Sequence, residues 1–130
     1  MAVYTAVNDG SAHFQATTYT GNGGAQTITN TGNSNLKPDW VWIKYRASGD
    51  HVLVDSSRGA TKEIKSNSDG AQSTAANGVT GFVTDGFTAN GAGDYNGNGG
   101  NYVAWQWKAN GGTEVTNNDG SVTTYVQLNS

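Results

Sequence analysis

Hydrophobic and polar residues alternate along short runs of this chain, with the period of two that is typical of β-strands. In "WVWIKYR", at 40–46, the aliphatic side chains of Val41 and Ile43 would share one face of a strand. The opposite face would carry Trp40, Trp42, Lys44 and Arg46. Similar runs, rich in β-branched and aromatic residues, predict strands at Val3–Val7, Phe14–Thr20, Gln26–Thr29, Trp40–Arg46, His51–Asp55, Glu63–Lys65, Gly81–Val83, Phe87–Thr88, Tyr102–Lys108 and Val122–Leu128.

Turn signals separate these strands. Asn-Gly and Asp-Gly pairs, which supply the positive φ angles of tight hairpins, recur along the chain. "TDGF", between Phe82 and Phe87, predicts a hairpin. The segment "GATKEIKSN", at 59–67, would form one helical turn at most, and 66–77 an exposed loop or sheet edge. Many short strands at this spacing predict an all-β fold, an antiparallel β-sandwich of jelly-roll or concanavalin A-like type.

The predicted core combines the aliphatic face of 41–43 with apolar residues from other strands. In "YVAWQWK", at 102–108, one face would carry Val103, Trp105 and Trp107. We expect this face to pack between the sheets, because large aromatic side chains usually fill interiors. The predicted core residues are Val41, Ile43, Val52, Val54, Phe82, Phe87, Val103, Trp105 and Trp107.

The composition agrees with short strands and turns. Glycine, threonine, asparagine and serine make up 60 of the 130 residues, and these residue types are poor helix formers. The length indicates one domain, residues 1–130, and the 13 aromatic residues argue against disorder. Within it, 113–130 would be a C-terminal strand or a contact segment. Because "SVTTYVQL" alternates as a strand does, we expect a cut at Gly112 to weaken the fold.

Charge and cysteine content exclude several functions. The net charge is −3 and the basic residues are scattered, so no nucleic-acid partner is expected. The chain has no cysteine, and hence no disulfide framework, thiolate metal site or thiol nucleophile. The segment "MAVYTAVNDG" lacks the charged region and apolar run of a signal peptide, so none is expected, and no apolar run is long enough to span a bilayer. We therefore expect synthesis in a cytoplasm and no membrane partner.

The face formed by Trp40, Trp42, Lys44 and Arg46 is the candidate binding site. Its cationic end argues against complete burial, so two interpretations remain open. The tryptophans could fill space between the sheets or under a loop, as large aromatic residues usually do. Alternatively, they could form a contact surface for a glycan or for another subunit.

Candidate catalytic residues are few. Glycoside hydrolysis requires two carboxylates at a defined separation, and nothing in the spacing of Glu63 and Glu114 indicates such a pair; both are expected to be exposed. His51, Asp55 and Ser56 could be part of a triad, but 51 and 55 would lie about 13 Å apart in a strand. We expect a protein that is not an enzyme.

Two further motifs have simple structural interpretations. Asp55 and Arg58, at a strand end, are expected to form an ion pair that fixes a turn. "DYNGNG", at 94–99, places oxygen ligands at Asp94, Asn96 and Asn98, like the opening of a calcium loop. The glutamate that should complete such a loop is replaced by Trp105, so no cofactor is expected and calcium stays a weak alternative.

Several segments together resemble a β-rich domain of uncharacterised function that is common in virion and tail-fibre-like proteins of marine bacteriophages. The similarity extends from about Ala12 to Gly112. Its most specific segments are "YTGNGG" (19–24), "KPDWVWIK" (37–44), "HVLVDSSRGATK" (51–62), "DGF" (85–87) and "YVAWQWKA" (102–109). Trp42, Trp105 and Trp107 match recurring positions, whereas Trp40 stands where an aliphatic residue is expected.

The resemblance implies a lectin-like or jelly-roll sandwich on a virus particle, without established catalytic residues. The expected function is that of a virion structural protein, tail-fibre-like or capsid-decorating, which mediates assembly and host-surface attachment. The alternative is a carbohydrate-binding, lectin-like module. Expected partners are copies of the chain in a homotrimer or larger array, other virion proteins and a cell-surface glycan. Relatives are expected to continue past "NNDGSVTTYV" into a further module.

Overall fold

The computed structural model describes residues 7–91, 93–109 and 114–127. Strands dominate it, with two short helical turns between them. In chain order the elements are η1 (Gly10–Ala12), β1 (Phe14–Thr20), β2 (Gln26–Thr29), β3 (Trp40–Tyr45), β4 (His51–Asp55), β5 (Lys62–Lys65), β6 (Ser73–Thr74), β7 (Val79–Val83), β8 (Gly86–Ala89), α1 (Gly93–Asn96), β9 (Asn101–Trp107), β10 (Glu114–Asn117) and β11 (Thr124–Gln127).

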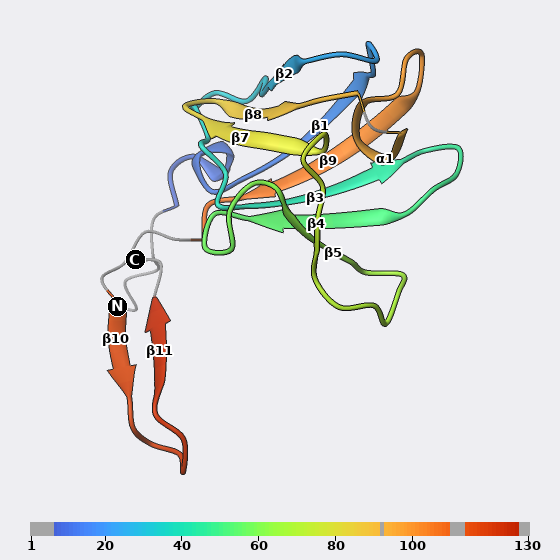
Figure 1. The fold of residues 1–130 in the computed structure, drawn as a ribbon. Helices are drawn as coiled ribbons and strands as arrows, with labels where there is room; N and C mark the ends of the chain where they lie inside the picture. Colours follow the sequence, from blue (N-terminus) through green and yellow to red (C-terminus); the bar gives the residue numbers. More distant parts are fainter. Residues whose placement is uncertain (1–6, 92, 110–113, 128–130) are drawn as a thin grey trace.

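Two antiparallel sheets pack face to face (Figure 1). The larger sheet has six strands in the order β1-β9-β3-β4-β5-β6, and the smaller sheet has the order β2-β8-β7. Strands far apart in the sequence are neighbours, since β9 lies between β1 and β3. The predicted all-β antiparallel sandwich is confirmed. No helix among the described residues is long and apolar enough to cross a membrane.

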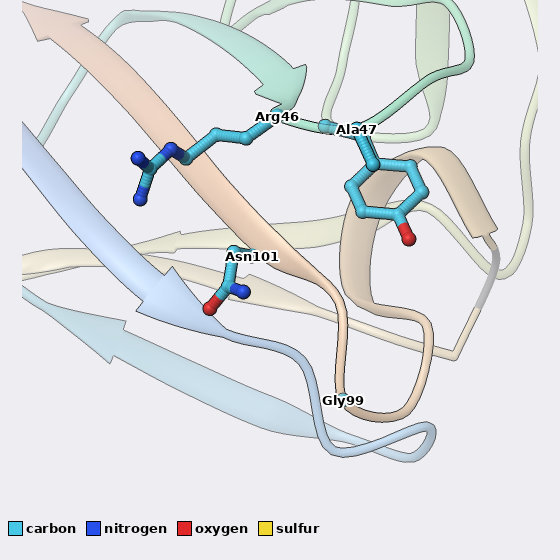
Figure 2. Close-up of a pocket in the computed structure, with 5 residues that line it drawn as sticks. Arg46, Ala47, Gly99 and Asn101 are labelled. Carbon is cyan, nitrogen blue, oxygen red and sulfur yellow. The ribbon is translucent and has the colours of Figure 1, made fainter.

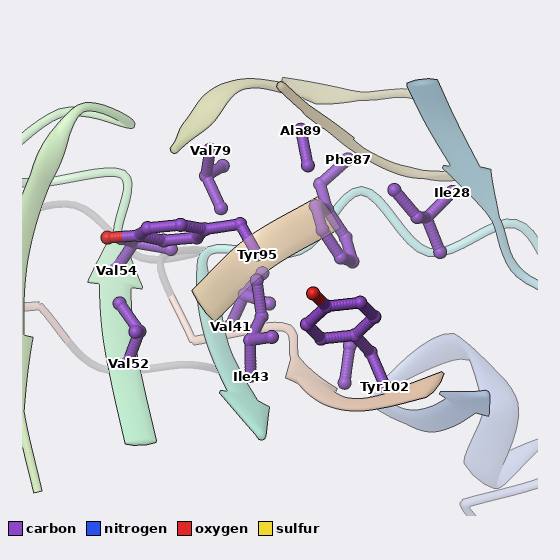
Figure 3. Close-up of a cluster of buried hydrophobic side chains, with 11 residues drawn as sticks. Ile28, Val41, Ile43, Val52, Val54, Val79, Phe87, Ala89, Tyr95 and Tyr102 are labelled. Atoms are coloured by element: carbon purple, nitrogen blue, oxygen red, sulfur yellow. The ribbon is translucent and has the colours of Figure 1, made fainter. Parts of the chain in front are cut away.

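The hydrophobic core lies between the two sheets (Figure 3). Side chains from the smaller sheet, including Phe87 and Ile28, pack against the larger sheet. Each large aliphatic or aromatic side chain buried there contributes about 1.5–3 kcal/mol to folding. The buried cluster consists of Ile28, Val41, Ile43, Val52, Val54, Val79, Phe87, Ala89, Tyr95, Tyr102 and Ala104, and Phe82 packs at its border.

The predicted hairpin at "TDGF" joins β7 to β8 and pairs Phe82 with Phe87. Gly86 has a φ of 113°, which side-chain-bearing residues rarely adopt. A Cβ at this position would also lie 2.0 Å from the carbonyl oxygen of Ile28 on the neighbouring strand. Glycine is therefore required at this turn both for its backbone angle and for the close approach of β2.

The predicted inward face of β9 is wrong. Tyr102, Ala104 and Gln106 are buried, whereas Val103, Trp105 and Trp107 lie on the outer face of the larger sheet. Alternation alone could not decide between these faces, because each carries large residues. Trp105 and Trp107 lie directly opposite the outward-facing Trp42 and Trp40 of β3, and residues opposite each other in paired strands share a face. The two tryptophans of β9 therefore lie on the outer face.

A buried polar network makes the inward orientation of Gln106 possible. The side-chain amide of Gln106 donates to Asn30 Oδ1, which also accepts from the Thr17 hydroxyl at 2.8 Å. Asn30 in turn donates to the carbonyl of Leu36 at 3.2 Å. Buried amides are tolerated when bonded in this way, so the inner face includes polar residues that a hydrophobicity pattern assigns to the surface.

Other differences from the predicted elements are local. The possible helical turn at 59–67 contains β5 instead, and β6 and β10 are additional strands. The predicted strand Val3–Val7 falls outside the described residues except for Val7, which is in no strand. The C-terminal strand β11 pairs with β10 in a separate hairpin and joins neither main sheet. Side chains from 115 to 125 are exposed, so this hairpin contributes no described side chain to the core.

Candidate functional site

Aromatic side chains line up across the outer face of the larger sheet. Phe14 on β1 is paired with Trp107 on β9, and Trp107 is paired with Trp40 on β3. Because residues directly opposite each other in paired strands share a face, these three side chains form one row. The row crosses three strands that are distant in sequence.

A second row lies beside the first. Trp105 on β9 is paired with Trp42 on β3, Trp42 with Leu53 on β4, and Leu53 with Ile64 on β5. The smaller sheet packs on the opposite side of these strands (Figure 1). We call the surface formed by both rows the aromatic face, and its residues are Phe14, Trp40, Trp42, Leu53, Ile64, Trp105 and Trp107.

The rings of this face pack against one another. Trp40 and Trp107 are stacked, with centroids 4.5 Å apart, and Trp42 lies 5.1 Å from Trp105. Phe14 lies 5.1 Å from Trp107. Such aromatic pairs each contribute about 0.5–1.5 kcal/mol beyond the area that they bury. The face is therefore a preorganised surface in which few side chains can change position independently.

The two tryptophans of β3, both predicted to belong to the site, differ in the exposed fraction of their side chains. Trp40 is 36% exposed, and Phe14, at the other end of its row, is 41% exposed. Trp42 is half-buried between Trp105 and Leu53, and its indole N–H has no hydrogen-bond partner among the described residues. Ring surface for a ligand or partner is thus most available at Trp40 and Phe14.

The outer surface becomes polar toward the C-terminal end of β3. Lys44 is paired with Val103 and with His51, and the backbone N–H of Arg46 donates to the carbonyl of Asn101 at 2.8 Å. We call this part the Arg46 end, and its residues are Thr18, Thr20, Lys44, Arg46 and Asn101. All four predicted site residues therefore lie on one surface, which joins indole rings to cationic groups.

Two adjoining hollows lie at the Arg46 end, and both are lined by Arg46 and Asn101. One has a volume of about 300 Å³ and is bordered by Tyr45, Ala47 and Gly99. The other, of about 270 Å³, is lined also by Thr18 and Thr20 among others. Figure 2 shows the side chains of Arg46 and Asn101, which both line the first hollow.

The cations of this surface are not neutralised by the protein. Among the described residues neither Lys44 nor Arg46 forms an ion pair. The nearby carboxylate of Asp50 is bonded by Lys65 and Asn67, which hold its pKa below the usual value. Lys44 and Arg46 therefore contribute two positive charges without an ion-pair partner among the described residues, although the whole chain carries −3.

Asp55 and Arg58 form a turn at the end of β4. Arg58 Nε donates to Asp55 Oδ2, and the backbone N–H of Arg58 donates to Asp55 Oδ1 at 2.8 Å. One carboxylate thus fixes both the main chain and the guanidinium. Asp55 lies directly opposite Trp40 in the pairing of β3 with β4. The carboxylate beside Trp40 is therefore already paired with Arg58.

The residues with calcium-like spacing contact different loops. Asp94 Oδ1 accepts from the backbone N–H of Asp50 at 3.2 Å. Asn96 is buried and donates to Asn22 Oδ1 at 2.9 Å and to the carbonyl of Gly24 at 2.7 Å. No group of three or more histidine, cysteine, aspartate or glutamate residues that could hold a metal ion occurs among the described residues. In the structure, Asp94 and Asn96 therefore fix loops.

The residues considered for catalysis are separated. His51 and Asp55 are at opposite ends of β4, and Ser56 donates to Asp39 at 3.2 Å. Glu63, which we expected to be exposed, is buried and accepts from Ser73 at 2.8 Å. The prediction of its exposure was wrong because β5 continues the larger sheet and turns this side chain inward. Glu114 lies in the separate β10–β11 hairpin.

Among the residues of this surface that sequence reasoning missed are Phe14, Trp105, Trp107 and Asn101. The pairing of β9 with both β1 and β3 brings them beside the predicted residues. The available signal was the matching spacing of "WVW" and "WQW", since two strands with tryptophans at alternate positions can align them in register.

Comparison with known proteins identifies a family. Residues 9–130 match the model of a family described as a domain of unknown function (DUF7483), and the chain belongs to this family. Neither the curated proteins nor the solved structures contain a match.

Proposed function

We propose that this domain is a non-enzymatic structural and attachment domain of a bacteriophage particle, and that the aromatic face is its contact surface. The observation that supports the proposal most is the row of Phe14, Trp107 and Trp40 on the outer face, in which Phe14 and Trp40 are exposed. Soluble monomers rarely expose large contiguous apolar surfaces unless these bind something. Tryptophan in particular is enriched among residues that dominate binding energy.

The arrangement of the face supports binding over a purely structural role for its tryptophans. Side chains that stabilise a fold are usually covered, yet Trp40 is 36% exposed while Val41 beside it is fully buried. Trp40 and Trp107 restrain each other by stacking, so little side-chain entropy would be lost when a partner covers them.

The assignment to a virus particle rests on the resemblance of "KPDWVWIK" and "YVAWQWKA" to domains of phage virion proteins. These two segments supply the four tryptophans of the aromatic face. In this proposal the protein is made in the host cytoplasm and incorporated into the virion. There it forms homotrimers or larger arrays and contacts other virion proteins.

Carbohydrate binding is the second candidate function, and the Arg46 end favours it. Partly exposed indole rings can stack on the apolar faces of sugars, while Lys44, Arg46 and Asn101 can bond their polar substituents. A subunit contact would use the same aromatic residues but would not require these free donors.

The proposal is tested by comparing wild-type protein with Trp40→Ala and Phe14→Ala. Sedimentation velocity would measure self-association, and a glycan array would measure attachment. We expect at least one of these interactions in the wild type, weakened in both variants. The matched control is Val7→Ala, which truncates an exposed apolar residue outside the aromatic face and outside the β10–β11 hairpin. A wild-type protein that stays monomeric and binds no glycan, or variants that bind as the wild type does, would refute the proposal.

A further inference from the structure

We propose that the aromatic face binds an acidic polysaccharide, with sugar rings on the indoles and a sugar carboxylate at the Arg46 end. This inference rests on the proposed function and names the ligand class of the same surface. Its basis is the set of hydrogen-bonding groups at Arg46 and Asn101, together with their distance from the tryptophans.

The Arg46 end presents donors more than acceptors. Thr20 Oγ1 donates to Asn101 Oδ1 at 3.2 Å, which uses one lone pair of the Asn101 amide oxygen. Its NH₂ group has no partner among the described residues, and neither does the guanidinium of Arg46. A guanidinium and an amide NH₂ beside one hollow form a site for an anion, because an anion accepts from both.

Neighbouring charges strengthen the preference for an anion. Lys44 lies one row closer to the tryptophans and is also unpaired among the described residues. Of the side chains that the strands place on this surface, Asp55 carries the one carboxylate, and Arg58 engages it. No described carboxylate of these strands therefore competes with a ligand for Arg46.

The distance between the tryptophans of the aromatic face and the Arg46 end indicates an extended ligand. Arg46 is four residues from Trp42 and six from Trp40, which corresponds to about 13 and 20 Å along a strand. A monosaccharide could not occupy both parts. An oligosaccharide several residues long could place ring faces on Trp40 and Trp107 while a carboxylate reaches Arg46.

Single-stranded nucleic acid is the main competitor, because bases also stack on aromatic side chains. The nucleic-acid backbone carries a phosphate at every nucleotide, and proteins that bind single strands contact these phosphates through an extended basic groove. Here Lys44 and Arg46 lie at one end, and at the Trp40 end Arg58 is paired with Asp55 and Lys108 with Asp39. An intermittently charged polysaccharide fits this distribution better.

The test is an array in which each acidic oligosaccharide is accompanied by its carboxyl-reduced, neutral form. We expect the wild type to bind at least one acidic member about tenfold more tightly than its neutral form, the effect of one charge-assisted hydrogen bond. Added salt should reduce this difference. Arg46→Gln should abolish this difference between the two forms, whereas Trp40→Ala should weaken the binding of both forms.

Controls separate the possible outcomes. Lys37→Gln removes an exposed positive charge before β3, at the opposite end from Arg46, and should keep the preference. Equal binding of acidic and neutral forms, lost in Trp40→Ala, would overturn the present inference but leave the proposed function standing. Binding of no oligosaccharide, or tighter binding of an oligothymidylate at the same face, would overturn the inference. If the protein in addition showed no self-association, the proposed function would also fail.

Discussion

Trp40 on β3 stacks on Trp107 of β9, with ring centroids 4.5 Å apart and ring planes inclined by 26°. The two residues are 67 positions apart in the chain, and they meet because β3 and β9 are paired in register. Their contact lies on the outer face of the sandwich, where it supports the fold and leaves ring surface available. Because the ring of Trp40 is partly exposed and that of Trp42 is half-buried, we expect different losses of stability when each is replaced by alanine.

Replacing Trp42 should cost more stability than replacing Trp40. Trp42 is half-buried between Trp105 and Leu53, so Trp42→Ala should lower the free energy of unfolding by about 2–4 kcal/mol. Trp40 is more exposed and its main ring contact is Trp107, so Trp40→Ala should cost about 1 kcal/mol. Urea unfolding of both variants measures the difference. The opposite order would mean that the exposed row, and not Trp42, supports the sheet.

At the turn that follows β4, we expect Asp55→Ala and Arg58→Ala to lower the stability by different amounts. Arg58→Ala removes the guanidinium but leaves the backbone N–H bond to Asp55 in place, so we expect a loss of about 0.5–1 kcal/mol. Asp55→Ala removes both bonds and should cost about 1–3 kcal/mol. Thermal unfolding of the two variants compares them. Equal losses would show that the ion pair, and not the backbone bond, fixes the turn.

The fold was predictable from the sequence because its signals are local. Period-two alternation located most strands, such as β1 and β4, and Asp-Gly located the β7–β8 turn. The orientation of β9 was not predictable in this way. Tyr102 and Gln106 point inward because they bond polar groups elsewhere in the fold: the Tyr102 hydroxyl donates to the carbonyl of Gly93, and the Gln106 NH₂ group donates to Asn30. Half of the candidate surface thus depends on contacts that no local pattern encodes.

Asn96 should be important for stability without any metal. Its buried amide bonds Asn22 and Gly24, and so joins α1 to the β1–β2 loop. Asn96→Ala would leave the Gly24 carbonyl without this donor, and we expect a loss of about 1–3 kcal/mol. Adding calcium or a chelator should leave the melting temperature of the wild type unchanged, because Asp94 and Asn96 serve different loops. A melting temperature that rises with calcium would instead favour a metal site at Asp94, Asn96 and Asn98.

Removing the β10–β11 hairpin should leave the sandwich intact, contrary to the expectation from the sequence. The alternation of 122–128 predicted a strand that supports the fold, and β11 does form, but it pairs with β10 alone. Val115 and Tyr125 are 52% and 67% exposed, so the hairpin buries little that could stabilise the two main sheets. We therefore expect a chain that ends at Ala109 to melt within a few degrees of the full chain, as for a change below about 0.5 kcal/mol. Differential scanning calorimetry of the two forms measures this, and sedimentation velocity shows whether the exposed hairpin contributes to contacts between subunits. A large drop in melting temperature would mean that the hairpin stabilises the sandwich; unchanged melting with weaker self-association would identify it as a contact segment.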